Sequence, residues 1–160
     1  MSKTLFGSVL PRRLVSVLVA ALFGLTLALN PISSPAANAA VSARVGVTAF
    51  RIAASELGVP YRWGGTRPWT GFDCSGLTQY TYLRAGRKLP RTAQQQYNDT
   101  IHISRAARRL GDLVFFYSGR TVYHVGIYAG NWSMIDAAHS GTRVRKEWIW
   151  SSHVLFGRVR

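Results

Sequence analysis

The chain has 160 residues, of which 48% are hydrophobic and 12% aromatic, and these values exclude a disordered polypeptide and favour one folded domain. Its formal net charge of +14 favours anionic partners. Nucleic acid is not an expected partner, because the basic residues are mostly isolated arginines and no nucleic-acid-binding module is evident.

The first forty residues have the layout of a secretory signal peptide. Basic residues come first, an apolar run spans 14–29, and the small-residue sequence Ala37-Asn38-Ala39 follows. The apolar run is shorter than the roughly 20 residues that cross a bilayer. We therefore predict a signal peptide over 1–39 and an exported domain over 40–160, with no stable transmembrane segment after processing. An uncleaved anchor is the alternative.

Processing would leave a strongly basic protein. It removes three of the 20 basic residues and none of the six acidic ones, so the mature net charge is +11. For an exported protein, the anionic polymers within reach are those of the bacterial envelope. A solvated basic surface without a partner is the alternative interpretation.

Helical patterns occupy the first half of the mature chain. Apolar residues recur at helical spacing over 44–57, and a loop rich in Gly, Trp and Thr follows over 61–72. A second helix is predicted over 74–85 with Asp73 as its N-cap. A third, short helix begins at Thr92, which forms a capping-box pattern with Gln95.

After Gly111 the period becomes that of strands, which are predicted at 113–117, 124–128, 132–137, 144–149 and 154–159. Helices followed by short strands with tight turns indicate an α+β domain with an antiparallel sheet.

Cys74 is the only cysteine, so no intrachain disulfide is possible in this exported chain. It opens the second predicted helix, where the partial positive charge of a helix N-terminus stabilises a thiolate. Free backbone N–H groups at that end can also face an oxyanion. These features favour a nucleophile over the alternative of an inert core cysteine.

A thiolate nucleophile needs a base, which is usually histidine. His124 opens a strand in which Val125 and Ile127 alternate with it, so its side chain lies on the opposite face from theirs. A three-residue loop over 129–131 would place His124 directly opposite Asp136, whereas a two-residue loop at 130–131 would put the two on opposite faces. We predict the three-residue loop, with Asp136 bound to one imidazole nitrogen and the other nitrogen free for Cys74.

Five blocks in order resemble the NlpC/P60 family of cell-wall cysteine peptidases over residues 49–159. They are Pro60-Tyr61-Arg62-Trp63-Gly64-Gly65, Gly71-Phe72-Asp73-Cys74-Ser75-Gly76-Leu77, Leu89-Pro90-Arg91-Thr92, Gly111-Asp112-Leu113-Val114-Phe115-Phe116 and His124-Val125-Gly126-Ile127-Tyr128. The resemblance implies a papain-like α+β fold, with N-terminal helices packed on a five- to six-stranded antiparallel sheet. It also implies hydrolysis of peptidoglycan stem peptides, typically between D-glutamate and a diamino acid, without a metal or organic cofactor.

The resemblance also assigns roles to individual residues. Cys74 matches the family nucleophile and His124 its base. Asp136 occupies the third polar position, which is usually His and otherwise Asn, Gln or Glu, and His139 is the fallback for that role. Residues that match substrate-contacting positions are Tyr61, which lines the site, and Asp73 and Ser75, which help to hold the substrate.

The combined prediction is a secreted or wall-associated peptidoglycan endopeptidase that uses Cys74 and His124. Two alternatives remain open. One is an amidase or acyltransferase that uses the same thiol chemistry on another envelope amide. The other is a non-catalytic wall-binding protein on the same scaffold.

Overall fold

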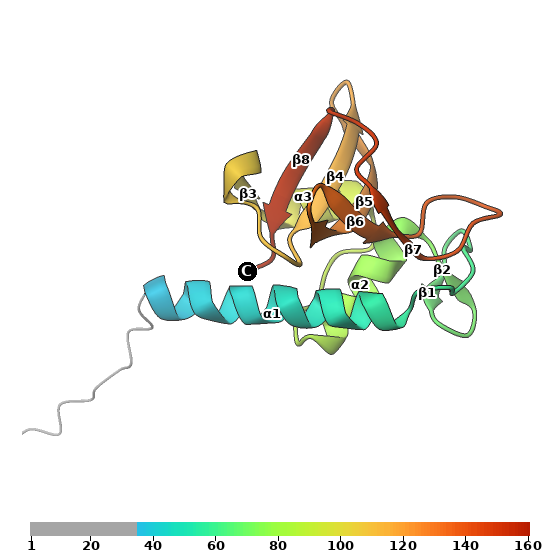
Figure 1. Ribbon diagram of the computed structural model, residues 1–160, viewed down its shortest axis with the longest axis horizontal. Coiled ribbons are helices and arrows are strands. Elements are labelled where there is room, and N and C mark those ends of the chain that lie inside the picture. Colours follow the sequence, from blue (N-terminus) through green and yellow to red (C-terminus); the bar gives the residue numbers. More distant parts are fainter. Residues whose placement is uncertain (1–34) are drawn as a thin grey trace, which may run out of the picture. The chain divides into compact units, whose positions relative to one another are not determined.

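The computed structural model of the protein describes residues 35–160 (Figure 1). Its helices are α1 (Pro35–Ser55), α2 (Cys74–Arg84) and α3 (Ala93–Asp99), with a short 3-10 helix η1 (Arg105–Ala107). Two short strands, β1 (Thr66–Arg67) and β2 (Gly71–Phe72), pair with each other. No helix among the described residues has the length and apolar character needed to cross a membrane.

The main sheet has six strands: β3 (Ile101–Ile103), β4 (Leu113–Ser118), β5 (Thr121–Gly130), β6 (Ser133–Asp136), β7 (Arg145–Trp148) and β8 (Val154–Arg158). Their order is β3-β8-β4-β5-β6-β7, and every neighbouring pair is antiparallel. The predicted α+β class with a five- to six-stranded antiparallel sheet is confirmed. β5 lies inside the sheet, with β4 on one side and β6 on the other.

Local signals placed the second and third helices well. Asp73 is the N-cap of α2, which begins at Cys74, and Thr92 forms a capping box with Gln95 at the start of α3. Helix α1 begins nine residues before the predicted 44, because its first turns are rich in alanine and helix propensity extends it without an apolar stripe. The predicted loop 61–72 contains β1 and β2, and β3 and η1 were not predicted.

The predicted signal peptide falls mostly on residues 1–34, which lie outside the described residues. The predicted cleavage site lies in the first turns of α1, where residues 35–41 are all exposed. The buried residues of α1 are Gly46, Ala49 and Ala53. Cleavage stays a prediction, and it would leave the packed part of the helix in place.

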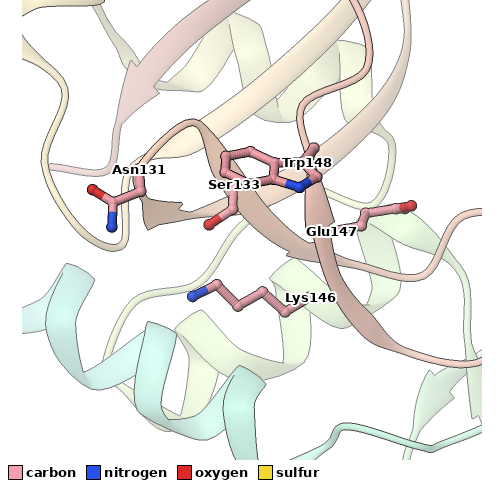
Figure 2. Close-up of a pocket in the computed structure, with 5 residues that line it drawn as sticks. All are labelled: Asn131, Ser133, Lys146, Glu147 and Trp148. Atoms are coloured by element: carbon pink, nitrogen blue, oxygen red, sulfur yellow. The ribbon is translucent and has the colours of Figure 1, made fainter.

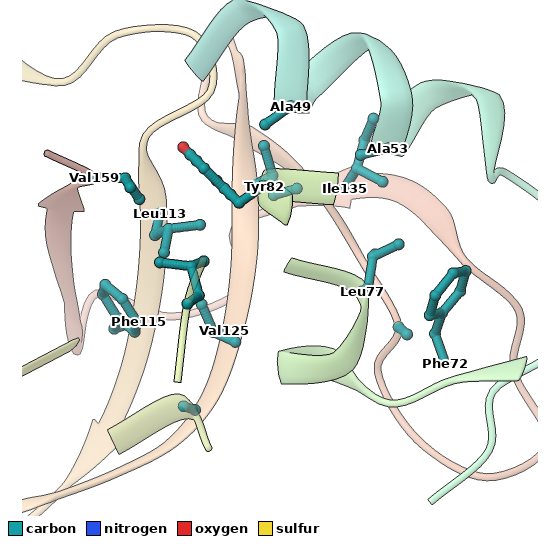
Figure 3. Packing of buried hydrophobic residues seen from close by; sticks show 14 of the residues in the cluster. Ala49, Ala53, Phe72, Leu77, Tyr82, Leu113, Phe115, Val125, Ile135 and Val159 are labelled. Carbon is teal, nitrogen blue, oxygen red and sulfur yellow. The ribbon is translucent and has the colours of Figure 1, made fainter. Parts of the chain in front are cut away.

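The main hydrophobic core lies between the helices and β5 (Figure 3). Ala49 and Ala53 of α1 are four residues apart on one helical face, and their small side chains let α1 approach α2 closely. Leu77 of α2 and Val125 of β5 are fully buried in the same cluster, and each contributes about 1.5–3 kcal/mol through burial. This packing holds the helix that begins at Cys74 against the strand that carries His124.

Candidate active site

The first turn of α2 is held by the carboxylate of Asp73. Its Oδ1 accepts the N–H of Gly76 at 2.7 Å, and its Oδ2 accepts the N–H of Gly64 at 2.9 Å. The guanidinium of Arg91 donates to both oxygens, at 3.1 and 2.5 Å. A buried carboxylate with these partners fixes the turn on which Cys74 lies, and the thiol of Cys74 remains partly exposed.

Glycine at position 76 allows the loop before α2 to contact the helix. A Cβ at this position would lie 2.0 Å from the carbonyl oxygen of Gly65. The same carbonyl accepts the N–H of Asp73 at 3.0 Å. The loop and the helix start therefore form one rigid unit around the cysteine.

His124 and Asp136 form a buried pair. The distance from Nε2 of His124 to Oδ2 of Asp136 is 2.7 Å, and the Asp136 side chain is completely shielded from solvent. A carboxylate can only accept, so Nε2 carries the proton and Nδ1 is left for Cys74. Cys74 lies close enough to His124 for its thiol and its negative charge to raise the pKa of the histidine.

These contacts favour the charged imidazolium. Burial lowers the pKa of His124, but the hydrogen bond to Asp136, the thiol of Cys74 and the charges of both groups raise it from 6.5 to about 9. Cys74 faces an imidazole that carries a proton at neutral pH. This is the charge state that a thiolate–imidazolium pair requires.

The predicted register between β5 and β6 is wrong. Tyr128 pairs with Met134 instead of Trp132, and the loop consists of Asn131 and Trp132. Both loop residues have positive φ, at 46° and 55°, as in the two-residue turns that suit the twist of a hairpin. A β-bulge at Ala129 precedes the turn, on the β5 side.

The bulge keeps the predicted contact despite the different register. With it, Asp136 comes opposite Gly126 and lies diagonally from His124, on the same face. Without the extra residue, Asp136 would face the other side of the sheet. Gly126 has no side chain, and a Cβ there would approach Cβ of Asp136 to 3.3 Å. The carboxylate therefore has room to reach across to His124.

The other predicted site residues surround the start of α2. Tyr61 is close enough to Cys74 and Asp73 for their negative charges to raise its pKa, after the larger effect of burial. Ser75 is buried, and its hydroxyl lies 2.9 Å from Nη1 of Arg91. His139 lies in an exposed turn, with Nδ1 2.9 Å from the carbonyl of its neighbour Ser140.

Three residues near the site had no predicted role. Arg91, which belongs to the Leu89–Thr92 block, donates to Asp73 and to Ser75. The Gln96 side chain is buried and donates to the carbonyls of Ser75 and Pro90, both at 2.9 Å. The signal that could have identified Gln96 is its position, since it is a side-chain amide on the inner face of a capped helix. The Trp150 ring lies 5.4 Å from that of His124, and no local pattern in the sequence indicates this contact.

A hollow of about 330 Å³ lies elsewhere, on β6 and β7 (Figure 2). Its lining residues are Asn131, Ser133, Lys146, Glu147 and Trp148, and they include neither Cys74 nor His124. Within residues 35–160 no group of three or more His, Cys, Asp or Glu side chains could hold a metal ion.

Comparison with known proteins agrees with this arrangement. The model of the NlpC/P60 family matches residues 58–158. The chain is 45% identical over 119 residues to the bifunctional muramidase/DL-endopeptidase CwlT of Bacillus subtilis, covering 71% of this chain and 36% of CwlT. It is 50% identical over 112 residues to the probable endopeptidase p60 of Listeria monocytogenes, covering 67% and 22%. It is 42% identical over 112 residues to the murein DD-endopeptidase MepH of Escherichia coli, covering 64% and 41%. The chain thus spans less than half the length of these relatives.

Solved structures share the fold. The NlpC/p60 domain of the peptidoglycan hydrolase SagA superposes with a TM-score of 0.65 and 34% identity, covering 72% of this chain and 98% of that domain. The peptidoglycan hydrolase RipB of Mycobacterium tuberculosis gives a TM-score of 0.65 and 31% identity, covering 75% and 67%. The family match, the relatives and the shared fold lead to one conclusion: the chain belongs to the NlpC/P60 family.

Proposed function

We propose that the protein is a cysteine endopeptidase that cleaves peptidoglycan stem peptides with Cys74, His124 and Asp136. The observation that carries the proposal is that His124 lies next to Cys74 and is hydrogen-bonded to the buried carboxylate of Asp136. Relatives described as DL-endopeptidase, murein DD-endopeptidase and peptidoglycan hydrolase support the substrate class.

The first chemical step is attack by the Cys74 sulfur on the carbonyl carbon of the scissile amide. The thiol proton resides on Nδ1 of His124, and the negative charge moves from the sulfur to the carbonyl oxygen as the C–S bond forms. At the start of α2, the N–H of Gly76 already donates to the side chain of Asp73, and the N–H of Leu77 donates to the Asp73 carbonyl oxygen. The N–H groups of Cys74 and Ser75 are therefore the candidates that bind the oxyanion.

In the second step the C–N bond breaks and the imidazolium of His124 gives its proton to the leaving amine. The raised pKa keeps that proton available through the neutral range. His124, now neutral, takes a proton from water as the water attacks the thioester. Release of the carboxylic acid product returns Cys74 and His124 to their starting state.

Asp136 orients His124 throughout. It fixes the Nε2–H tautomer, so Nδ1 stays directed at the sulfur. Solved structures of RipA include forms mutated at a cysteine, at a histidine and at a glutamate twelve positions after that histidine. Asp136 follows His124 at the same spacing. This agreement supports a carboxylate as the third member here.

The scissile bond in this proposal joins D-glutamate to the diamino acid. The test is to incubate the protein with purified peptidoglycan and to identify the released fragments by mass spectrometry, with Cys74→Ala as the matched control. Fragments cut at that bond in the wild type alone are expected. Fragments cut at the D,D cross-link instead would overturn the bond assignment. Release that persists in Cys74→Ala would overturn the mechanism.

We also propose that the protein is exported and held near the wall by its positive charge. Four of its six acidic residues, Asp73, Asp112, Asp136 and Glu147, already pair with a basic side chain. Most of the 17 basic residues over 40–160 therefore have no acidic partner and can attract anionic wall polymers. Binding to isolated envelopes should fall as salt rises, and salt-independent binding would contradict this proposal.

A further inference from the structure

A second carboxyl group lies beside Asp136, on the side away from His124. It belongs to Glu147 of β7, the strand that pairs with β6. In that register Met134 is opposite Glu147 and Asp136 is opposite Arg145. Glu147 is therefore the diagonal neighbour of Asp136 on the same face of the sheet.

Each carboxyl group uses one oxygen and leaves the other buried. Oδ2 of Asp136 accepts from His124, and Oε2 of Glu147 lies 2.8 Å from Nη2 of Arg145. The remaining atoms, Oδ1 of Asp136 and Oε1 of Glu147, are shielded from solvent and have no donor among residues 35–160. Two ionised carboxylates cannot satisfy each other, because both only accept, and a buried unsatisfied acceptor costs about 1–3 kcal/mol.

One proton between the two carboxyl groups satisfies both oxygens. The side chains of Glu147 and Asp136 are within hydrogen-bonding reach of each other. Figure 2 shows the Glu147 carboxyl directed away from the amine of Lys146, so that amine is not its partner. The charged and titratable groups around the pair are His124 on β5, Arg145 on β7 and, through His124, Cys74 on α2.

We propose that Glu147 is a positioning residue for catalysis: protonated Glu147 donates from Oε1 to Oδ1 of Asp136 and so holds Oδ2 on His124. This inference rests on the proposed function and adds a fourth member to the chain Cys74–His124–Asp136. The two carboxyl groups then carry one negative charge between them, which faces the imidazolium. The direction of the Glu147 pKa agrees, since burial and Asp136 raise it more than Arg145 lowers it.

The proton itself can be observed by infrared spectroscopy. The wild type at neutral pH should show the C=O stretching band of a protonated carboxyl group. Glu147→Gln should lack the band, since it leaves Asp136 ionised. Arg145→Gln is the matched control: it removes the contact of Arg145 with Oε2 of Glu147 but not the carboxyl group, so the band should stay. A wild type without the band, or a band that survives in Glu147→Gln, would overturn the proposal.

The positioning role is tested by alkylation of Cys74 with iodoacetate as a function of pH, which needs no peptidoglycan. Glu147→Ala should react about tenfold more slowly at neutral pH, the order of loss seen when an outer hydrogen-bond partner of a site is removed. The alkaline limb of its rate profile should also move to lower pH. Glu147→Gln keeps a donor and should restore most of the rate, and the Arg145→Gln control should match the wild type.

Equal rates for Glu147→Ala and the wild type, or equal losses in Glu147→Ala and Glu147→Gln, would refute the role of the proton. Thermal unfolding of each variant shows whether the fold is intact. Because alkylation reports only on the thiol and its histidine, this outcome is independent of the peptidoglycan digestion. The digestion can fail while Glu147 still positions Asp136, and the reverse also holds.

Discussion

Replacing Asp136 by asparagine removes the charge opposite His124 with almost no change in side-chain shape. The rise in the pKa of His124 from 6.5 to about 9 corresponds to about 3 kcal/mol in favour of the imidazolium. Burial alone acts in the opposite direction. Without the carboxylate, only Cys74 opposes the effect of burial, so the pKa of His124 should fall well below 9 and less of the histidine should be protonated at neutral pH.

Asparagine can present either its carbonyl oxygen or its amide N–H to Nε2. Its amide can donate to Nε2, which would move the imidazole proton to Nδ1, the nitrogen that has to accept from Cys74. Peptidoglycan hydrolysis should fall by about 10²-fold or more, since general acid–base catalysis supplies that order of rate enhancement. His139→Gln is the matched control and should keep wild-type activity, because His139 contacts its own turn.

The pKa is measured from the NMR titration of the imidazole Cε1–H signal of His124 in the wild type and in Asp136→Asn. Stability gives a second readout. A raised pKa stabilises the folded state fully below 6.5, and this contribution is lost as pH rises through about 9. The difference in unfolding free energy between wild type and variant should thus be largest below 6.5 and should shrink towards pH 9.

An unchanged His124 titration in Asp136→Asn would refute this electrostatic explanation. Loss of activity in His139→Gln, with full activity in Asp136→Asn, would show that His139 and not Asp136 orients His124.

Three further changes test the surroundings of the site. Gly76→Ala places a Cβ 2.0 Å from the Gly65 carbonyl oxygen, so the melting temperature should fall sharply in thermal denaturation; a wild-type value would contradict the close packing. Arg91→Ala leaves the buried Asp73 carboxylate without its strongest partner and should cost about 1–3 kcal/mol in urea unfolding, whereas no loss would show that the ion pair is dispensable. A chain that begins at Val41 should unfold at the same temperature as one that begins at Pro35, because residues 35–41 are exposed; a clear drop would show that the first turns of α1 support the fold.

The elements that the sequence predicted best are those with a chemical signal at their ends. Asp73 before Cys74, and the Thr92–Gln95 capping box, placed the starts of α2 and α3 correctly. The first turns of α1 and the strand β3 were missed because neither has buried residues that would create a period. An exposed segment forms because of its helix propensity or because it pairs with a neighbouring strand. The apolar pattern of the sequence indicates neither.

The sequence predicted only part of the site, because local patterns do not determine the register of the strands or the contacts between distant segments. The contact between His124 and Asp136 was expected, but from a register that the structure does not have. Asn131 tolerates positive φ, but Trp132 is a bulky residue that rarely adopts it, so the sequence contains no signal for a turn at 131–132. The contact of Trp150 with His124 and the Glu147–Asp136 pair depend on how loops and strands fold together in space, which local patterns do not encode.

The bulge at Ala129 restricts how the length of this hairpin can vary. Deleting one residue between His124 and Asp136 would turn the carboxylate into the apolar layer formed by Val125 and Ile127, where it would have no basic partner. Deleting or inserting two residues would keep Asp136 on the same face of the sheet as His124 and would change only the distance between the two side chains. Viable length changes in this segment should therefore come in even steps, and single-residue insertions and deletions should be selected against more strongly than most substitutions there.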